Sequence, residues 1–107
     1  MFVLAKEFQF TWPVRVRVPT DDGEHAIQTF TARFRLLSHG RAAALGGDAR
    51  ALLDAALVGW EGIATDGGGV LQVTEAAKAA LLDHPFVLVA LAEAYADALS
   101  GKAAAKN

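Results

Sequence analysis

Residues 8–18 read FQFTWPVRVRV, and this stretch decides the fold class of the chain. Apolar and polar side chains alternate along it, which is the period of a β-strand with one buried and one exposed face. Pro13 lies inside the alternation and has no N–H to donate to a neighbouring strand. We therefore expect this strand at a sheet edge or at a bulge.

A second alternating stretch, TFTARFRL at residues 29–36, follows a turn at residues 19–24, which read PTDDGE. Two such runs separated by a polar, glycine-containing turn predict a long β-hairpin. One register keeps every large apolar side chain on a single face. Its pairs are Val18 with Ala26, Trp12 with Ala32 and Phe10 with Phe34. Because a lone hairpin is marginal in water, the rest of the chain must cover this apolar face.

After the hairpin, the spacing of apolar residues changes from the strand period to the helical one. Residues 41–45 predict a short helical turn. Asp48 is a suitable N-cap for a helix over Ala49–Val58, which Gly59 ends. The buried stripe expected for this helix is Leu52, Leu53, Ala56 and Leu57.

Two further helices are expected after a glycine-rich turn at residues 65–69. Thr74 caps one over Glu75–Leu82, and Pro85 begins the other at the position that proline favours, with Asp83 or His84 as its cap. The buried face expected for the last helix is Leu88, Leu91, Ala92, Tyr95 and Leu99. A second apolar face remains on it, formed by Phe86, Val87, Val89 and Ala90. That face is more than a small monomer needs and indicates self-association or a partner helix.

The block VGWEGI at residues 58–63 places a large aromatic residue between two glycines. Each glycine costs about 1 kcal/mol inside a helix, so we expect the chain to change direction here. Trp60 is then a packing anchor that holds the preceding helix against the hairpin, and Trp12 and Tyr95 are the other anchors. Glu61 has no visible partner base or nucleophile, so the block is interpreted as a structural corner.

The chain of 107 residues suits one domain. We expect an α+β fold in which a β-hairpin in residues 1–37 packs against about three helices in residues 38–101, with a frayed tail over residues 102–107. The net charge of −2 is unlike the basic balance of nucleic-acid-binding domains. The absence of cysteine excludes a disulfide, a thiolate zinc site and a cysteine nucleophile.

No run of residues approaches the roughly 20 apolar residues that cross a bilayer. Lys6 and Glu7 follow the apolar start of the chain, which is unlike a signal peptide. We therefore expect no membrane partner and a location inside the cell that makes the protein.

The residue types that usually carry chemistry are scattered. His25 in the hairpin turn, His39 and His84 have none of the close spacings of a metal site. The acidic residues 21, 22 and 24 are typical of a solvated turn, and the glycines at 67–69 lack the lysine and hydroxyl residue of a phosphate loop. We predict no catalytic residue, no metal and no cofactor.

Four arginines, namely Arg15, Arg17, Arg33 and Arg35, fall on the polar face of the predicted hairpin. Like charges on one face of a sheet repel, so we expect a compensating feature. One interpretation is a solvated face that prevents sheet-edge aggregation. The other is a docking surface for an acidic partner. Nucleic acid fits poorly, because the aromatic side chains lie on the opposite face and cannot stack on bases.

Six short motifs occur in a characteristic order along nearly the whole chain. They are Trp12-Pro13-Val14, Phe30-Thr31-Ala32-Arg33-Phe34, Val58-Gly59-Trp60-Glu61-Gly62, Thr74-Glu75, Ala94-Tyr95 and Lys106-Asn107. In this layout the chain resembles the small tail assembly chaperones of long-tailed bacteriophages and prophages. Each motif is short, so their order and spacing carry the resemblance, and residues 59–62 are the strongest match.

This resemblance implies a non-enzymatic assembly factor with the tape measure protein and the tail tube protein as partners. Members of that family keep the tape measure protein soluble and help tail tube subunits polymerise around it. They act in the cytoplasm of the bacterial host and are generally absent from the finished virion. In many phages the gene also makes a longer product by ribosomal frameshift, and Ala103–Lys106 is where such an extension would attach.

Two other functions fit the same residues. A structural virion protein, such as a tail or head–tail connector subunit, would also be small, α+β and free of cysteine. A small enzyme or ligand-binding module is the third reading, and the missing catalytic constellation argues against it.

Overall fold

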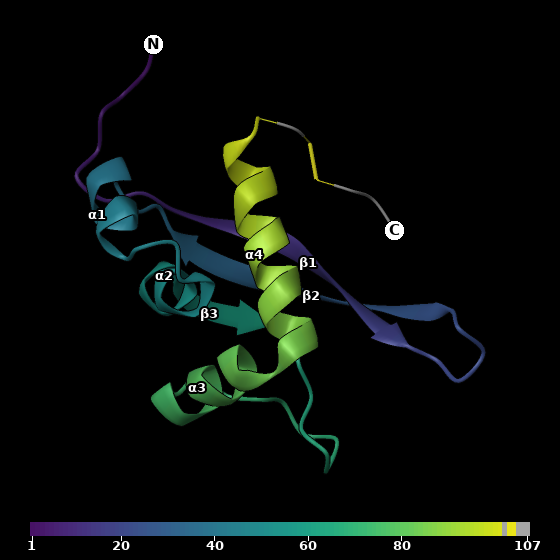
Figure 1. The fold of residues 1–107 in the computed structure, drawn as a ribbon. Helices are drawn as coiled ribbons and strands as arrows, with labels where there is room; N and C mark the ends of the chain where they lie inside the picture. Colours follow the sequence, from purple (N-terminus) through teal and green to yellow (C-terminus); the bar gives the residue numbers. More distant parts are fainter. Residues whose placement is uncertain (102, 105–107) are drawn as a thin grey trace.

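The computed structural model describes residues 1–101 and 103–104, in which helices pack on one antiparallel sheet (Figure 1). The strands, in their order in the sheet, are β1 (Gln9–Pro19), β2 (His25–Arg35) and β3 (Leu57–Glu61). The helices are α1 (His39–Ala44), α2 (Ala49–Ala56), α3 (Glu75–Asp83) and α4 (Pro85–Leu99). The predicted α+β class, with an N-terminal hairpin packed against helices, is confirmed.

β1 and β2 form the predicted long hairpin in the predicted register. Val18 pairs with Ala26, Trp12 with Ala32 and Phe10 with Phe34. β1 is an edge strand, which is where the missing N–H of Pro13 costs least. The connecting turn covers residues 20–24, so His25, which we expected in the turn, is the first residue of β2.

The helix predicted over residues 49–58 is shorter, and its last part is a strand. Asp48 caps α2 as expected, accepting hydrogen bonds from two backbone N–H groups of the first turn, but the helix ends at Ala56. Residues 57–61 form β3, which pairs with the segment of β2 from Thr31 to Phe34. Val58 and Gly59 are weak helix formers, and pairing with β2 supplies the backbone hydrogen bonds that a longer helix would have made.

The change of direction expected at residues 58–63 lies at the end of β3. Gly59 is a buried strand residue paired with Arg33, and it does not end a helix. A bulge leaves Val58 without a partner in β2. Gly62 follows the strand with a φ of +88°, a left-handed conformation that glycine adopts at little cost. The sharp turn therefore depends on the second glycine of the block.

Trp60 lies on the buried face of the sheet, in a row with the two other strands. Ala32 of β2 pairs with Trp12 on one side and with Trp60 on the other, so a small residue separates the two indole rings. Trp60 is buried, and its Nε1 donates a hydrogen bond to the carbonyl oxygen of Leu71 at 3.0 Å. Trp60 is thus the expected anchor, but it belongs to the sheet itself and also holds the segment after the turn.

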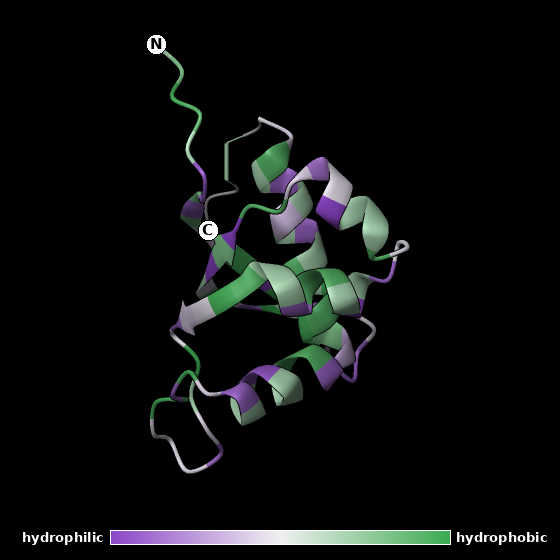
Figure 2. Cartoon of the chain, turned by 90° about the vertical axis from the view of Figure 1, so that its left-hand side faces the viewer, coloured by the Kyte–Doolittle hydropathy of each residue, from purple (hydrophilic) through white to green (hydrophobic). Residues whose placement is uncertain are grey.

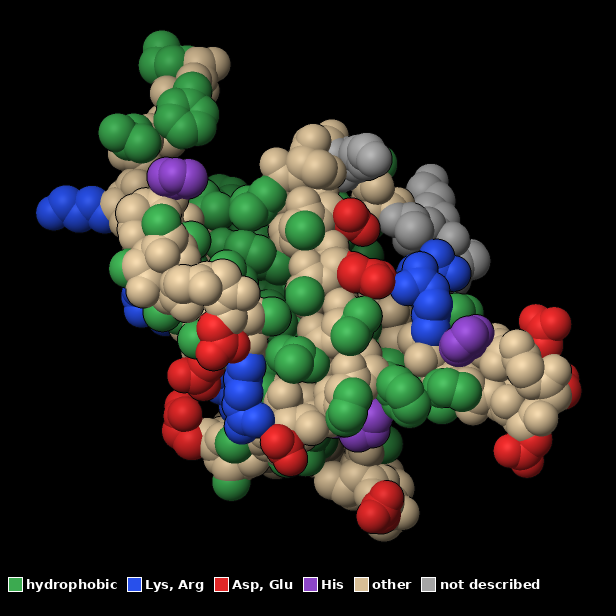
Figure 3. All heavy atoms as spheres, viewed as in Figure 1, with side chains coloured by type: hydrophobic (Ala, Val, Ile, Leu, Met, Phe, Trp, Pro, Cys, Tyr) green, Lys and Arg blue, Asp and Glu red, His purple; other side chains and the backbone are tan. Residues whose placement is uncertain are grey.

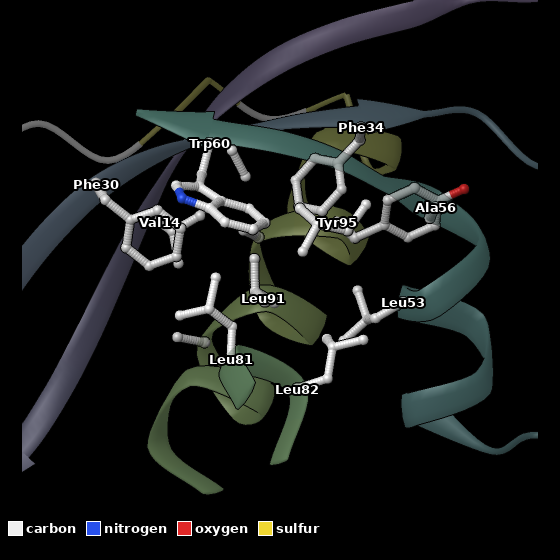
Figure 4. Packing of buried hydrophobic residues seen from close by; sticks show 14 of the residues in the cluster. Val14, Phe30, Phe34, Leu53, Ala56, Trp60, Leu81, Leu82, Leu91 and Tyr95 are labelled. Carbon is white, nitrogen blue, oxygen red and sulfur yellow. The ribbon is translucent and has the colours of Figure 1, made fainter. Parts of the chain in front are cut away.

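One hydrophobic cluster joins the sheet to the helices, and Figure 4 shows its packing. Its larger side chains come from β1, β2, β3, α2, α3 and α4; they are Val14, Phe30, Phe34, Leu53, Trp60, Leu82, Leu91 and Tyr95. The ring of Tyr95 packs edge-on against Phe34, with 5.4 Å between ring centroids. Its hydroxyl accepts a hydrogen bond from the backbone N–H of Leu37 at 3.1 Å, so Tyr95 anchors α4 to the end of the hairpin.

The buried face of α4 is rotated from the predicted one. The fully buried residues are Ala90, Leu91, Ala94 and Tyr95, whereas Leu88 and Ala92 are half-buried and Leu99 is 54% exposed. α4 packs mainly along β1, the edge strand. The small side chains of Ala90 and Ala94 let α4 approach β1 closely. The buried face that contains them is less apolar than the face that we predicted from the helical spacing.

α3 and α4 follow each other with a bend of 96° between them. Thr74 caps α3 through its hydroxyl, and Pro85 occupies the first turn of α4 with His84 as cap residue, both as predicted. Within the described residues no single helix is long and apolar enough to cross a membrane. The bent α3–α4 pair passes the same test on length and composition.

The turn predicted at residues 65–69 is present. The backbone N–H of Thr65 donates to the carbonyl oxygen of Gly69 at 2.8 Å, and Ala64 and Val70 form a β-bridge on either side of it. We expected a frayed tail over residues 102–107, but residues 102 and 105–107 lie outside the described part of the chain. The Lys106-Asn107 motif lies outside it too.

Candidate partner-binding surface

The hairpin register places the four arginines on one face of the sheet, opposite the buried row of Trp12, Ala32 and Trp60. Two of them have acidic partners within the chain. Arg17 Nη1 lies 2.9 Å from Glu93 Oε2 of α4, and Arg35 Nε lies 2.7 Å from Glu7 Oε1. These partners are 76 and 28 residues away in sequence, so the spacing of charges along the hairpin did not reveal them.

The other two arginines lie in different surroundings. Arg15 lines a small hollow of about 100 Å³ between β1 and α4, which Glu93 and Asp97 also line. Its Nε is buried and has no hydrogen-bond partner. Arg33 is exposed and lines a hollow of about 340 Å³ beside Glu61 and Val73. Within the described residues Arg33 forms no ion pair, so it is the arginine most available to a partner.

The second apolar face expected on α4 divides into a buried and an exposed part. Ala90 belongs to the core and Val87 is half-buried, which corrects the expectation that all four residues face a partner. Phe86 and Val89 remain 41% and 58% exposed. Figure 3 shows hydrophobic side chains gathered around the start of α4, beside the base of the projecting hairpin.

Phe86 also lines the largest hollow of this surface, which we call the hairpin groove. Its volume is about 500 Å³. The apolar side chains that line it include Val16, Val18, Phe30, Ile63, Phe86 and Val87. The groove lies where the apolar face of the hairpin extends beyond the helices that cover its base. It is an apolar, open site of the kind that receives a peptide or a helix.

The sequence reasoning missed the N-terminal segment of residues 1–4, which reads MFVL. All four side chains are exposed, and the segment extends away from the body of the protein (Figure 2). The signal was available, because five consecutive apolar residues, 1–5, precede Lys6 without belonging to the strand alternation. A second apolar groove of about 290 Å³ lies nearby, where Phe8 and Leu36 approach Leu99 at the end of α4.

The acidic hairpin turn has the geometry of a solvated turn. The hydroxyl of Thr20 and the backbone N–H of Glu24 both donate hydrogen bonds to the carboxylate of Asp22. These bonds, with the hydroxyl of Thr20 as the larger cause, lower the pKa of Asp22. In the described part of the chain no group of three His, Asp or Glu side chains is placed to hold a metal ion.

Comparison of the chain with models of protein families, with curated protein sequences and with solved structures finds no match.

Proposed function

We propose that this protein is a non-enzymatic tail assembly chaperone, which keeps the tape measure protein soluble and promotes assembly of the tail tube. The single observation that supports it best is the open hairpin groove with exposed Phe86 and Val89 beside it. The order of the six sequence motifs, which resembles that of the tail assembly chaperones, supports this choice of family. The proposal includes action in the cytoplasm of the bacterial host and absence from the mature virion.

The groove suits an amphipathic helix of the client. A helix with its side chains is about 10 to 12 Å wide, and its apolar stripe is the part that aggregates in water. The groove offers apolar walls from both the hairpin and α4, so the stripe would lose contact with water there. Exposed Arg33, on the other side of the sheet, can meet acidic residues of a client that wraps around the strand edge.

The experiment is co-expression of this chain with a tape measure protein. We expect more of the client in the soluble fraction with the wild-type chain than with the double variant Phe86→Ser and Val89→Ser. Both side chains are exposed, so the variant should fold, which circular dichroism would check. Val70→Ser is the matched control, because Val70 is an exposed apolar residue that lines neither apolar groove.

Client solubility that is the same with and without the wild-type chain would refute the chaperone function. Mass spectrometry of purified particles tests the remaining part of the proposal. Stoichiometric amounts of this chain in finished particles would favour the structural virion protein instead.

A further inference from the structure

β2 has a backbone edge with no neighbouring strand. β3 pairs only with the segment from Thr31 to Phe34, so within the described residues the part from His25 to Thr29 has β1 on one side and no strand on the other. All five of these residues are exposed. A free edge of this kind is a template for another strand, and HAIQT contains neither the lysine nor the proline that commonly blocks such pairing.

The free edge borders the hairpin groove. Val16 pairs with Gln28 and Val18 pairs with Ala26, so these four residues share one face of the hairpin. All of them except Ala26 line the groove. On the opposite face, Ile27 is an exposed apolar residue. A strand added here would therefore need apolar residues on both faces.

The N-terminal segment has the composition that this edge requires. Phe2, Val3 and Leu4 are consecutive apolar residues, and even Val3, the least exposed of residues 1–4, is 75% exposed. Lys6 follows the segment and gives it a positive charge, while the neighbouring Glu7 is paired with Arg35. The hairpin turn beside the free edge carries the acidic residues Asp21, Asp22 and Glu24. The N-terminal segment therefore matches the free edge of β2 in two ways. Its apolar side chains suit the apolar faces there, and its positive charge suits the acidic turn.

We propose that the N-terminal segment of a second copy of this chain binds to the free edge of β2 as an added antiparallel strand. The structure favours one register, in which Phe2 lies opposite Gln28 and Leu4 lies opposite Ala26. Phe2 and Leu4 then enter the hairpin groove beside Val16 and Val18. On the other face Val3 contacts Ile27, and at the end of the strand Lys6 meets Glu24. A slip of one residue would turn Phe2 and Leu4 away from the groove. A slip of two residues would keep them there but would separate Lys6 from Glu24.

A copy cannot donate this strand to itself. Its own segment leaves β1 at Gln9, opposite Arg35, so it could only run along β2 in the parallel direction. To place Phe2 opposite Gln28, the segment would also have to run back along β2 from Arg35 to Gln28, which is seven residues or about 23 Å. The seven residues from Phe2 to Phe8 span that distance only when fully extended, and the path crosses the sheet. Antiparallel addition therefore requires a second chain.

The segment and its binding edge lie at opposite ends of the protein (Figure 1). The contact is therefore heterologous, and each copy has one segment to donate and one edge to fill. This inference does not depend on the proposed chaperone function, since its experiments use the purified chain alone.

The first experiment measures the molar mass by light scattering across a concentration series. We expect the wild-type chain to exceed the monomer mass of 11.2 kDa. The segment variant (Phe2→Asp with Leu4→Asp) and the edge variant (Ala26→Asp with Gln28→Asp) should each be monomeric. Mixed together, they should form a one-to-one complex, because the edge variant still donates a segment and the segment variant still offers an edge. Val70→Asp is the control and should associate like the wild type, because Val70 is exposed and lines neither apolar groove.

The second experiment tests the register, which is simple in a chain without cysteine. Under oxidation, a chain with Val3→Cys mixed with a chain with Ile27→Cys should form a disulfide-linked heterodimer. The control replaces Ile27→Cys by Glu75→Cys, at the exposed start of α3, and should link far less. Three results would overturn the proposal: a monomeric wild type, a segment variant that still associates, or equal cross-linking in the two mixtures.

Discussion

At the scale of single residues, Trp60 is a large buried side chain on the inner face of the sheet. It packs beside Ala32 in the row that also holds Trp12, and its Nε1 donates to Leu71 across the turn of residues 62–70. The same side chain therefore joins β3 to β2 and to the segment that leads into α3. Trp60 is buried, and we predict that its role is structural.

We expect Trp60→Ala to lower the free energy of unfolding by about 3 to 5 kcal/mol, since it removes a large buried ring and leaves a cavity. This is a large part of the stability of a typical domain. Urea unfolding followed by far-UV circular dichroism would measure it. Trp12→Ala is the control with a smaller expected loss, because Trp12 is only half-buried. A well-folded but inactive Trp60→Ala protein would show that Trp60 has a direct functional role.

At the scale of elements, the ion pair between Glu7 and Arg35 ties the N-terminal segment to the end of β2. Hydrogen bonds from Arg35 and, secondarily, from Gln9 lower the pKa of Glu7 below its ordinary value of 4.5. The ionised carboxylate is therefore the form that the folded protein stabilises. It contributes to stability fully above pH 4.5, and the contribution is lost as the pH falls through the lower pKa of the folded state.

A comparison of the wild type with Glu7→Gln tests this contribution. The difference in free energy of unfolding should be small and constant above pH 5, and it should shrink as the pH falls below 4.5. Thermal unfolding in a series of buffers would follow it. Glu61→Gln is the control, because Glu61 is exposed and forms no ion pair within the described residues. A difference that grows at acidic pH would contradict the assigned ion pair.

At the scale of the whole molecule, helices cover one face of the sheet and leave Arg33 exposed on the other. Under the proposed chaperone function, Arg33→Glu should leave folding intact and weaken retention of the proposed client, the tape measure protein, in a pull-down. Arg35→Glu is a poor test, because it would also place a like charge beside Glu7. Arg41→Glu on α1 is the matched control. Unchanged retention by Arg33→Glu would remove the sheet face from the docking surface.

Local patterns in the sequence were sufficient to predict the hairpin and the residues at which the helices begin. The alternation of side chains puts Phe10, Trp12 and Phe34 on one face and excludes registers shifted by one residue. Pairing Val18 with Ala26 across the short turn then gives the observed register. Asp48 and Thr74 cap the helices that follow them through bonds to the next turn. The exposed positions of Phe86 and Val89 were also expected from the helical spacing of α4.

Only the tertiary structure decided the features that depend on distant contacts. Residues 57–61 became a strand because β2 offered an unpaired edge, and α4 rotated because its alanines fit against β1. The partners of Arg17 and Arg35 and the hairpin groove likewise come from elements far apart in sequence. The sequence by itself thus determined which segments are strands of the hairpin and where helices begin, since those energies are local. Which faces are buried, and which stay open to a partner, was decided by packing between elements.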